Sequence, residues 1–327
     1  MALTRVGTAV SGRQGGVATA AALSLLVLAG CGPAQEGGED AAASDGTYPL
    51  TVETSHGEVT IDEAPERVVA LGFASAEELL SLGVTPVSVA EDPETLDQSV
   101  PWMAEEIADI SDPGLITADG EPNLEAIAAA EPDLVIAQTY QVSDQAAFDR
   151  LNAVAPTVTP ATDAANADWD ERLLKTAEAV DRTAEAEELI AGIEAEFTGI
   201  GSAVPGIGDR TYQWVRADTT GYAFGNGALF ELFGLRPADN QDNTQTSDPL
   251  SRENTADLDA DLLAVWAPGD EEREQIDGDP LFQSLPSVEA GTVYYADLAF
   301  ANAINSAGPM SLRWLAEELR PTVEALG

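Results

Sequence analysis

Side chains that serve as nucleophiles or as metal ligands of the histidine and cysteine type are scarce in this sequence of 327 residues. Cys31 is its single cysteine and His56 its single histidine, which excludes Ser-His-Asp and Cys-His catalysis and zinc sites built mainly from those two residue types. No HExxH or G-x-S-x-G motif is present. We therefore expect a binding protein and not an enzyme; a surface-anchored hydrolase that uses a carboxylate pair is the less favoured alternative.

His56 lies at the tip of a predicted hairpin. Apolar and polar residues alternate over Tyr48–Ile61, on both sides of Ser55-His56-Gly57. A single histidine in a turn is usually solvated, so we expect no catalytic or metal role for it.

Aromatic rings and arginines remain as the candidate binding residues. Half of them lie at or just after the end of a predicted strand, and the other half lie nearby. Aromatic faces suit a bulky, partly apolar ligand, and guanidinium groups suit anionic oxygens. The alternatives are core packing for each ring and a surface ion pair for each arginine. The candidate set is Phe73, Trp102, Tyr140, Arg216, Tyr222, Phe224, Arg236, Trp266, Phe300 and Arg313.

Alternating strands and helices must position these side chains. Arg67–Gly72 has the apolar character of a buried strand, Ser75-Ala76-Glu77-Glu78 is a capping box that opens a helix, and Val87–Ala90 is the next strand. This alternation indicates a parallel sheet covered on both faces, and ligands collect beyond the carboxyl ends of its strands. Further strands are predicted at Leu134–Ala137, Pro156–Val158 and Thr211–Arg216.

A segment rich in Ala, Glu and Leu separates the two halves of the chain. Asp168–Gly199 contains no proline, and its apolar residues recur at helical spacing. We predict a long helical connector over 166–203, with Asp181-Arg182-Thr183 as a candidate break. It joins an N-terminal lobe, 48–165, to a C-terminal lobe, 204–327.

Landmarks recur in the same order on both sides of the connector. They indicate two α/β lobes of like topology with a ligand cleft between their strand ends. The predicted fold class is α/β, with two Rossmann-like lobes whose central, mostly parallel sheets are joined by one long α-helix. The repeated pairs are Gly83-Val84-Thr85-Pro86 with Gly234-Leu235-Arg236-Pro237, Glu125 with Glu253 (at equal distances before Asp133 and Asp261), and Phe148-x-x-Leu151-x-x-Val154 with Phe282-x-x-Leu285-x-x-Val288.

The first 31 residues have the pattern of an export signal. Arg5 and Arg13 precede the apolar run Val17–Leu28, which is too short to remain as a membrane span. Leu28-Ala29-Gly30-Cys31 resembles a bacterial lipobox, which implies that Cys31 becomes the lipid-modified first residue. The small and acidic residues of 32–47 then form a flexible tether. We expect a chain outside the cytoplasm, anchored to the membrane through Cys31.

The chain is strongly acidic. Removal of the leader takes two of the 14 basic residues and none of the 58 acidic ones, which leaves 12 basic against 58 acidic and a net charge of −46. Such a surface argues against nucleic acid or anionic lipid as a partner. We expect a monomer.

Taken together, these stretches resemble the iron-siderophore-binding lipoproteins of ABC importers. The resemblance is carried by RVVALGFASAEELLSLGVTPV, EPNLEAIAAAEPDLVIA, Ala155-Pro156-Thr157-Val158, DPLFQSLPSVEAGTVYYAD and Ser311-Leu312-Arg313-Trp314. It implies a ferric siderophore as ligand, an ABC permease dimer as partner, and docking to that permease through Glu125 and Glu253. Cobalamin and haem, which the same class binds, are the alternative ligands.

The expected ligand is an Fe(III) complex that arrives already chelated. No cluster of His, Cys or Tyr at ligand spacing could hold bare iron, so we predict neither a cofactor nor a metal bound directly by the chain. Few arginines oppose the excess of negative charge, which favours a neutral or cationic ferric hydroxamate over a trianionic catecholate complex.

Overall fold

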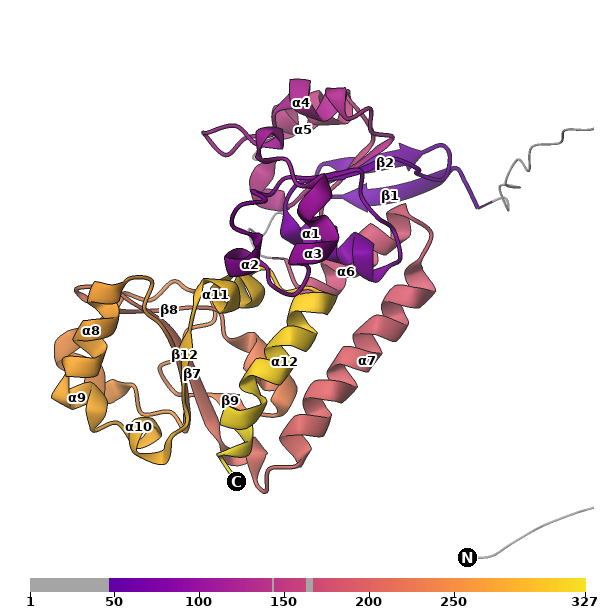
Figure 1. Cartoon of the computed structure of the whole chain (residues 1–327). Helices are drawn as coiled ribbons and strands as arrows, with labels where there is room; N and C mark the ends of the chain where they lie inside the picture. The colour runs from indigo at the N-terminus through magenta and orange to yellow at the C-terminus, as the bar shows by residue number, and fades with distance from the viewer. Residues whose placement is uncertain (1–46, 143, 163–166) are drawn as a thin grey trace, which may run out of the picture. The chain divides into compact units, whose positions relative to one another are not determined.

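The computed structural model describes residues 47–142, 144–162 and 167–327. The predicted signal, Cys31 and nearly all of the tether lie outside these ranges. The described chain contains a two-stranded hairpin, a four-stranded sheet and a six-stranded sheet (Figure 1). The four-stranded sheet lies within 48–165 and the six-stranded sheet within 204–327. We call these two parts the N-lobe and the C-lobe.

The hairpin has the predicted form. Strand β1 (Leu50–Thr54) pairs antiparallel with β2 (Gly57–Ile61). His56 is not solvated as expected, because its ring stacks on Phe148 with the centroids 4.8 Å apart.

The N-lobe sheet is entirely parallel, in the order β4-β3-β5-β6. Consecutive residues of its strands face opposite cores: Val68 and Ala70 pack into one cluster, and Val69 packs into the other. Apolar residues on both faces are what a parallel sheet covered by helices requires. The strands are β3 (Val68–Ala70), β4 (Ser88–Val89), β5 (Leu134–Ile136) and β6 (Thr157–Val158). The α-helices are α1 (Phe73–Ser81), α2 (Leu96–Ser99), α3 (Ala104–Ile107), α4 (Leu124–Ala129) and α5 (Gln145–Asn152), and the 3-10 helices are η1 (Ala108–Ile110), η2 (Pro113–Leu115) and η3 (Thr139–Gln141).

Helix α1 does not begin at the predicted capping box. It begins at Phe73, and no side chain of its N-cap residue caps it. The carboxylate of Glu91 accepts from the Phe73 N–H instead, at 3.0 Å. Ser75 is buried inside the helix, where its Oγ accepts from Nε2 of Gln138 at 2.9 Å. The capping-box prediction was wrong because Ser75 and Glu78, the two residues of the box, bond to side chains of other elements and not to the start of the helix.

The C-lobe sheet is mostly parallel, in the order β10-β8-β7-β11-β12, with β9 also paired to β7. β7, β11 and β12 are parallel, and β8 is antiparallel to β7. The predicted α/β class is therefore confirmed in both lobes. The strands are β7 (Thr211–Ala217), β8 (Gly221–Phe224), β9 (Arg236–Pro237), β10 (Leu250–Ser251), β11 (Leu262–Trp266) and β12 (Val293–Ala296). The helices are η4 (Ile207–Asp209), η5 (Ala228–Phe233), η6 (Arg252–Asp257), α8 (Asp270–Gly278), α9 (Pro280–Gln283), α10 (Pro286–Ala290), α11 (Leu298–Asn305) and α12 (Pro309–Glu324).

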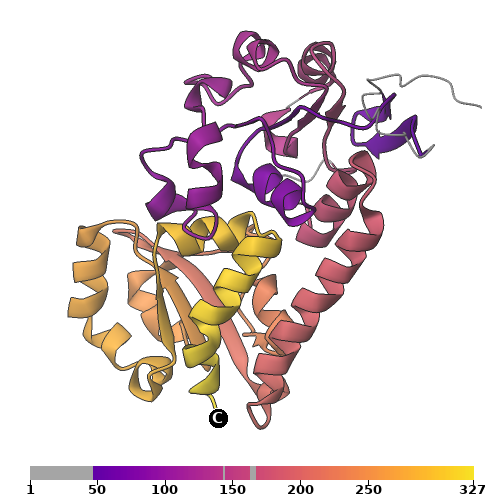
Figure 2. The same cartoon turned by 45° about the vertical axis from the view of Figure 1, so that its right-hand side comes forward.

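The connector consists of two helices and not one. α6 (Trp169–Ala179) and α7 (Thr183–Ser202) are separated by Asp181, whose φ of 55° is left-handed and ends the first helix. α6 packs its apolar side into the N-lobe core, whereas the C-terminal half of α7 packs into the C-lobe core. Helix α7, about 30 Å long from its 20 residues, is therefore the strut, and it runs alongside α12 (Figures 1 and 2). None of the helices in the described ranges is long and apolar enough to cross a membrane.

Buried carboxylates of α1 hold the two lobes together. Glu77 reaches across to the first turn of α12, where its Oε2 accepts from the Ser311 N–H and its Oε1 from the Ser311 hydroxyl, both at 2.9 Å. A Cβ on Gly308 would lie 2.2 Å from Glu77 Oε1, so this contact needs glycine there. The N-lobe thus supplies the cap for a C-lobe helix.

The neighbouring Glu78 forms the second half of this joint. It accepts from Nε of Arg172 at 3.1 Å and from the Thr176 hydroxyl at 2.7 Å, both on α6. The same guanidinium also donates to the carbonyl of Ala307, just before α12. Glu78 and Arg172 are both buried, and each has lost its hydration. Removal of either partner would leave the other charge uncompensated.

Folding stability should depend on pH through Glu77. Burial raises its pKa from 4.5 to about 8, so between these values the unfolded chain releases a proton that the folded chain keeps. Stability therefore falls as pH rises, and Glu77→Gln, which keeps an acceptor for the Ser311 N–H, removes this loss. We expect the free energy of unfolding of the variant, minus that of the native chain, to rise by about 1 kcal/mol per pH unit between pH 5 and 8. Urea unfolding at several pH values measures both free energies.

The control for this prediction is Glu187→Gln on the exposed side of α7, which removes the same charge from the surface. Equal pH slopes for the native chain and Glu77→Gln would contradict the prediction.

Candidate functional site

The carboxyl ends of three N-lobe strands bring predicted and unpredicted side chains together. Phe73 follows β3, Tyr140 follows β5, and Glu91 follows β4. Gln141 braces this edge by donating from Nε2 to the carbonyl of Leu71 at 2.7 Å. Tyr140 is partly covered by its neighbours and keeps 58 % of its surface exposed. The N-lobe therefore presents two aromatic rings and a carboxylate at one edge.

Tyr140 lies within electrostatic reach of Glu91 and Arg172. Its pKa is raised, first because surrounding atoms displace water from the phenol and second because Glu91 is negative, whereas Arg172 acts in the opposite direction. Burial also raises the pKa of Glu91, from 4.5 to about 7.

The C-lobe edge pairs an arginine with an indole. Arg216 and Trp266 are register partners near the carboxyl ends of β7 and β11, and the guanidinium lies 5.6 Å from the Trp266 ring centroid. Arg216 is exposed, and within the described part of the chain it forms no ion pair shorter than 4.0 Å. It is therefore free to meet an anionic group of a ligand.

Trp102 lies between the lobes. Its ring contacts Phe73 of the N-lobe at 6.1 Å and Trp314 of α12 at 5.4 Å, measured between centroids. Its indole N–H is buried and has no hydrogen-bond partner among the described residues. Near it, Nδ2 of Asn302 donates to the carbonyl of Ser99 at 3.0 Å across the same boundary. The structure thus gives Trp102 a packing role between the lobes.

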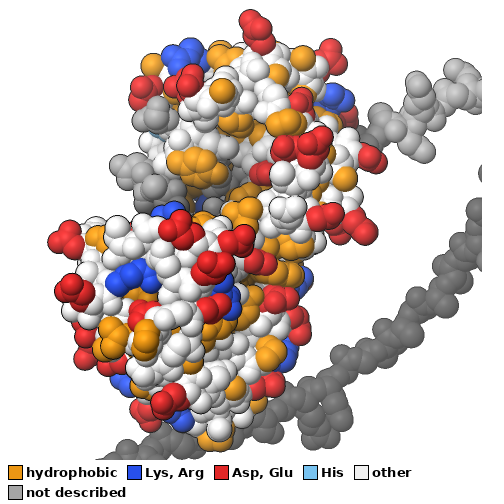
Figure 3. Space-filling view, turned by 60° about the vertical axis from the view of Figure 1, so that its left-hand side comes forward, with side chains coloured by type: hydrophobic (Ala, Val, Ile, Leu, Met, Phe, Trp, Pro, Cys, Tyr) orange, Lys and Arg blue, Asp and Glu red, His pale blue; other side chains and the backbone are white. Residues whose placement is uncertain are grey.

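A pocket of about 190 Å³ opens between the start of α6 and the C-lobe. Figure 3 shows a hollow between the two lobes. The walls of the pocket come from the start of α6, the start of η5 and the segment that joins α11 to α12. Arg172 lines it, but this guanidinium is already bonded to Glu78 and Ala307. The lining residues are Ala167, Asp168, Trp169, Asp170, Arg172, Asn226, Ala228, Leu229, Leu232, Ile304, Asn305 and Ala307.

Gly225-Asn226-Gly227 forms a turn at the wall of this pocket. A Cβ on Gly225 would lie 2.2 Å from Nε1 of Trp214, and one on Gly227 would lie 2.7 Å from the Tyr212 ring. These glycines let the backbone pass close to two large core rings.

Three predicted aromatic residues do not reach the cleft as proposed. Tyr222 and Phe300 are fully buried, and Phe300 packs between Trp214 and Tyr294 at centroid distances of 5.3 and 4.7 Å. Phe224 lies with Tyr222 on the other face of the sheet from Trp214. The predicted positions of these three residues near strand ends are correct, but their side chains pack into or against the core.

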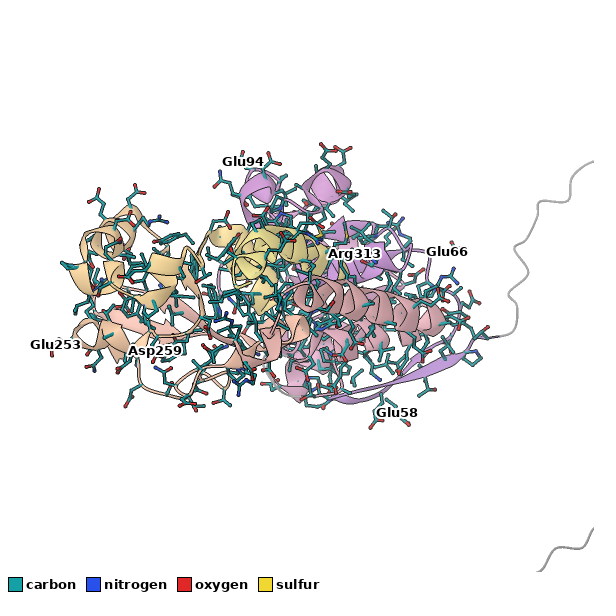
Figure 4. All side chains as sticks on the ribbon, turned by 90° about the horizontal axis from the view of Figure 1, so that it is seen from below. Glu58, Glu66, Glu94, Glu253, Asp259 and Arg313 are labelled. Carbon is teal, nitrogen blue, oxygen red and sulfur yellow. The ribbon has the colours of Figure 1, made fainter. Side chains whose placement is uncertain are left out.

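Two predicted arginines also lie elsewhere. Arg236 pairs with Thr211, the first residue of β7, and so sits at the opposite end of that strand from Arg216. Arg313 is exposed on α12, with Glu196 of α7 as its nearest carboxylate at 3.9 Å (Figure 4). Neither is brought to the strand ends, because Arg236 lies beside the start of β7 and Arg313 lies on the exposed side of α12.

The predicted docking glutamates are both exposed. Glu125 lies in the first turn of α4, whose N-cap Asn123 accepts from the Ala126 N–H. Glu253 lies in the first turn of η6 and at the outer edge of the C-lobe (Figure 4). Neither forms an ion pair with a described residue.

Residues 68–299 match a family model described as periplasmic binding protein. The chain belongs to the periplasmic binding protein family. Two lobes with parallel sheets and a cleft between their strand ends agree with this membership.

Characterised relatives of this family member have iron-related names. The chain is 25 % identical over 287 residues to the Fe(3+)-citrate-binding protein YfmC of Bacillus subtilis, an alignment that covers 84 % of this chain and 86 % of that protein. It is 32 % identical over 164 residues to the probable siderophore-binding lipoprotein YfiY of the same organism, covering 49 % of this chain and 46 % of that protein.

Solved structures show the same fold. A periplasmic solute-binding protein of Mycobacterium smegmatis aligns with a TM-score of 0.70 at 24 % identity, over 85 % of this chain and 99 % of that one. Staphylococcus aureus SirA, solved in complex with staphyloferrin B, aligns with a TM-score of 0.67 at 21 % identity, over 83 % and 97 %.

Sequence reasoning missed Glu91, Arg172 and Asn226. Glu91 could have been found, because it directly follows the predicted strand Val87–Ala90 and the strand-end rule applies to it as to Phe73. Arg172 and Asn226 carried no such signal, since a helix and a loop bring them to the pocket. In the described ranges, no three His, Cys, Asp or Glu side chains are grouped so that they could hold a metal ion.

The Gly225 turn yields a testable prediction. Gly225→Ala must displace the Trp214 ring or the pocket wall, and overpacking of this kind costs about 1–3 kcal/mol. We expect a loss of stability of that size in urea unfolding. The matched control is Gly208→Ala, whose new Cβ would meet nothing within 4 Å. Equal stabilities of the two variants would show that the turn tolerates a side chain.

Proposed function

We propose that this chain is the extracytoplasmic solute-binding component of an ABC importer and that it captures a ferric siderophore. The observation that carries the proposal is the cleft between the strand ends of the two lobes, with aromatic rings on both sides and a free guanidinium on one. Membership of the periplasmic binding protein family and the iron-related names of its relatives support the same ligand class.

The chemistry of the cleft fits a metal chelate better than bare iron. Phe73, Tyr140 and Trp266 offer apolar faces to the organic part of a chelator, and Arg216 offers donors to its oxygen atoms. Such a complex exceeds the 190 Å³ pocket in size and would extend from it along the cleft.

The charges around the cleft favour a neutral or cationic complex. Arg172 is committed to Glu78, which leaves Arg216 as the guanidinium of this edge without an ion pair in the described chain. Asp218 lies within electrostatic reach of Arg216, and Glu91, Asp168 and Asp170 add further negative charge at the N-lobe edge and at the pocket. A trianionic catecholate would therefore meet more repulsion than a ferric hydroxamate.

The anchoring of the protein is also part of this proposal. Lipid attached to Cys31 would hold the chain at the outer surface of the membrane, and the acidic segment 32–47 would give it reach toward a permease. The chain would act as a monomer and would perform no chemistry on its ligand.

Ferric complexes should bind the purified mature chain saturably. Trp102, Trp169 and Trp266 lie around the cleft, so a bound ferric chelate should quench tryptophan fluorescence, with a Kd of about 1 μM or tighter for the preferred complex. The panel comprises ferrioxamine, a ferric catecholate and ferric citrate, with the iron-free chelators as controls. Parallel additions to N-acetyltryptophanamide correct for absorption by the chelate. Absence of saturable quenching by every ferric complex would overturn the proposed function.

Docking to the permease should depend on Glu125 and Glu253. Each exposed carboxylate can accept a bidentate contact from an arginine, and such charged contacts are strong. We expect Glu125→Ala with Glu253→Ala to reduce siderophore uptake by cells about tenfold while ligand affinity stays unchanged.

The matched control is Glu187→Ala with Glu194→Ala, which removes two exposed glutamates of α7. Uptake that falls equally in both double variants would assign the effect to net charge and reject the docking role.

A further inference from the structure

Glu91 is a partly buried carboxylate that has no cationic partner among the described residues. No Lys, Arg or His nitrogen of the described chain lies within 4.0 Å of it. Its Oε1 accepts from the Phe73 N–H at 3.0 Å, and its Oε2 has no hydrogen-bond donor in the described ranges. Partial burial of a carboxylate without a cation is costly. Oε2 of Glu91 is an acceptor that no donor of the described ranges uses.

The other buried carboxylates near this edge differ from Glu91. Both oxygens of Glu77 accept from Ser311, and both oxygens of Glu78 accept, from Arg172 and Thr176. Those carboxylates are satisfied within the protein. Glu91 is therefore the carboxylate of this edge that has an oxygen without a donor in the described chain.

Glu91 lies at the same strand-end edge of the N-lobe as Gly72 and Phe73. Its Oε1 lies 3.9 Å from the place where Gly72 would carry a Cβ, and Nε2 of Gln141 lies 3.7 Å from the same place. Gly72 has a φ of 104°, which favours glycine, and it precedes Phe73 at the end of β3. Tyr140 is near enough for the charge of Glu91 to raise its pKa. Glu91 thus shares one edge with both aromatic rings.

Capping of α1 does not by itself account for a carboxylate here. A neutral oxygen acceptor would satisfy the Phe73 N–H equally, as Asn, Ser and Thr do at helix starts. The negative charge, held where burial opposes it, is the feature left to explain. Partly desolvated charges of this kind are concentrated at binding sites.

We infer that Glu91 is a specificity-determining residue that receives a positively charged hydrogen-bond donor of the ligand, so that the preferred ligand is a ferric chelate bearing a protonated amine. This inference rests on the proposed function. Phe73 and Tyr140 add ring faces that attract a cation. Arg216 on the C-lobe would take the oxygen-rich iron centre, and Glu91 on the N-lobe would take the ammonium group.

A pair of ferric trihydroxamates tests this charge preference. Ferrioxamine B carries a protonated amine on its chain, whereas ferrioxamine E is cyclic and neutral and has the same type of iron centre. At about pH 8 the native chain should bind ferrioxamine B about tenfold more tightly than ferrioxamine E. Glu91→Gln, which keeps an oxygen acceptor for the Phe73 N–H, should abolish this ratio and change the affinity for ferrioxamine E by no more than about twofold.

The preference should also depend on pH. Glu91 gains a proton as pH falls from about 8 to 6, so the native chain should lose affinity for ferrioxamine B and keep its affinity for ferrioxamine E. Both affinities should be flat in Glu91→Gln. The other charged or titratable groups that act with Glu91 are Asp92 beside it and Tyr140 in η3, and Tyr140 is also within reach of Arg172 in α6.

The outcomes separate this inference from the proposed function. Glu94→Gln, an exposed neighbour, is the matched control and should leave the ratio intact. Equal binding of both complexes by the native chain, preference for an anionic complex, or an equal loss of both affinities in Glu91→Gln would overturn the role of Glu91 alone. Failure of every ferric complex to bind would overturn both proposals. A thermal melt of Glu91→Gln shows whether the variant remains folded.

Discussion

The polar joint between α1, α6 and α12 is the constraint on which the rest of the structure depends. Glu77 and Glu78 are buried, and a buried carboxylate is tolerated only where donors replace its lost water. Those donors are Ser311 in the C-lobe and Arg172 on α6, and Arg172 also bonds the segment before α12. Because such bonds have narrow geometry, the lobes cannot shift at this point without leaving a buried charge unpaired. The joint therefore fixes where one sheet edge lies relative to the other.

The binding edge and the joint lie on the same helix. α1 begins at Phe73, beside Glu91 and Gly72, and within its next turn it presents the two buried carboxylates. A displacement of the joint would therefore move the first aromatic residue of the cleft. Trp102 completes this coupling, since it packs against Phe73 in one lobe and Trp314 in the other. Helix α7 is the strut that sets the spacing of the lobes, whereas the polar joint sets their orientation.

Charge explains how so acidic a chain can still be selective. Most of its carboxylates are exposed, where water and salt screen them, and they repel any anion alike. Few charges remain at the two strand-end edges, because Arg172 is neutralised by Glu78, which leaves Glu91 on the N-lobe and Arg216 on the C-lobe. A ligand with an oxygen-rich, neutral iron centre at one end and a cation at the other matches this arrangement better than an anionic ligand.

The sequence by itself determined the class of fold, the two-lobed plan and the positions of Phe73, Tyr140, Arg216 and Trp266 at strand ends. These follow from local periodicity and from the rule that parallel strands end at one edge, and both are properties of short segments. The sequence marked Asp181 as a candidate break and left the choice open. That choice, the start of α1 at Phe73 and the burial of Phe300 were decided only by tertiary structure. They depend on partners far away in the chain: Glu91 replaces the predicted cap, and α11 carries Phe300 into the core. Which arginines meet the cleft was decided in the same way, because the direction of a side chain is set by the packing around it.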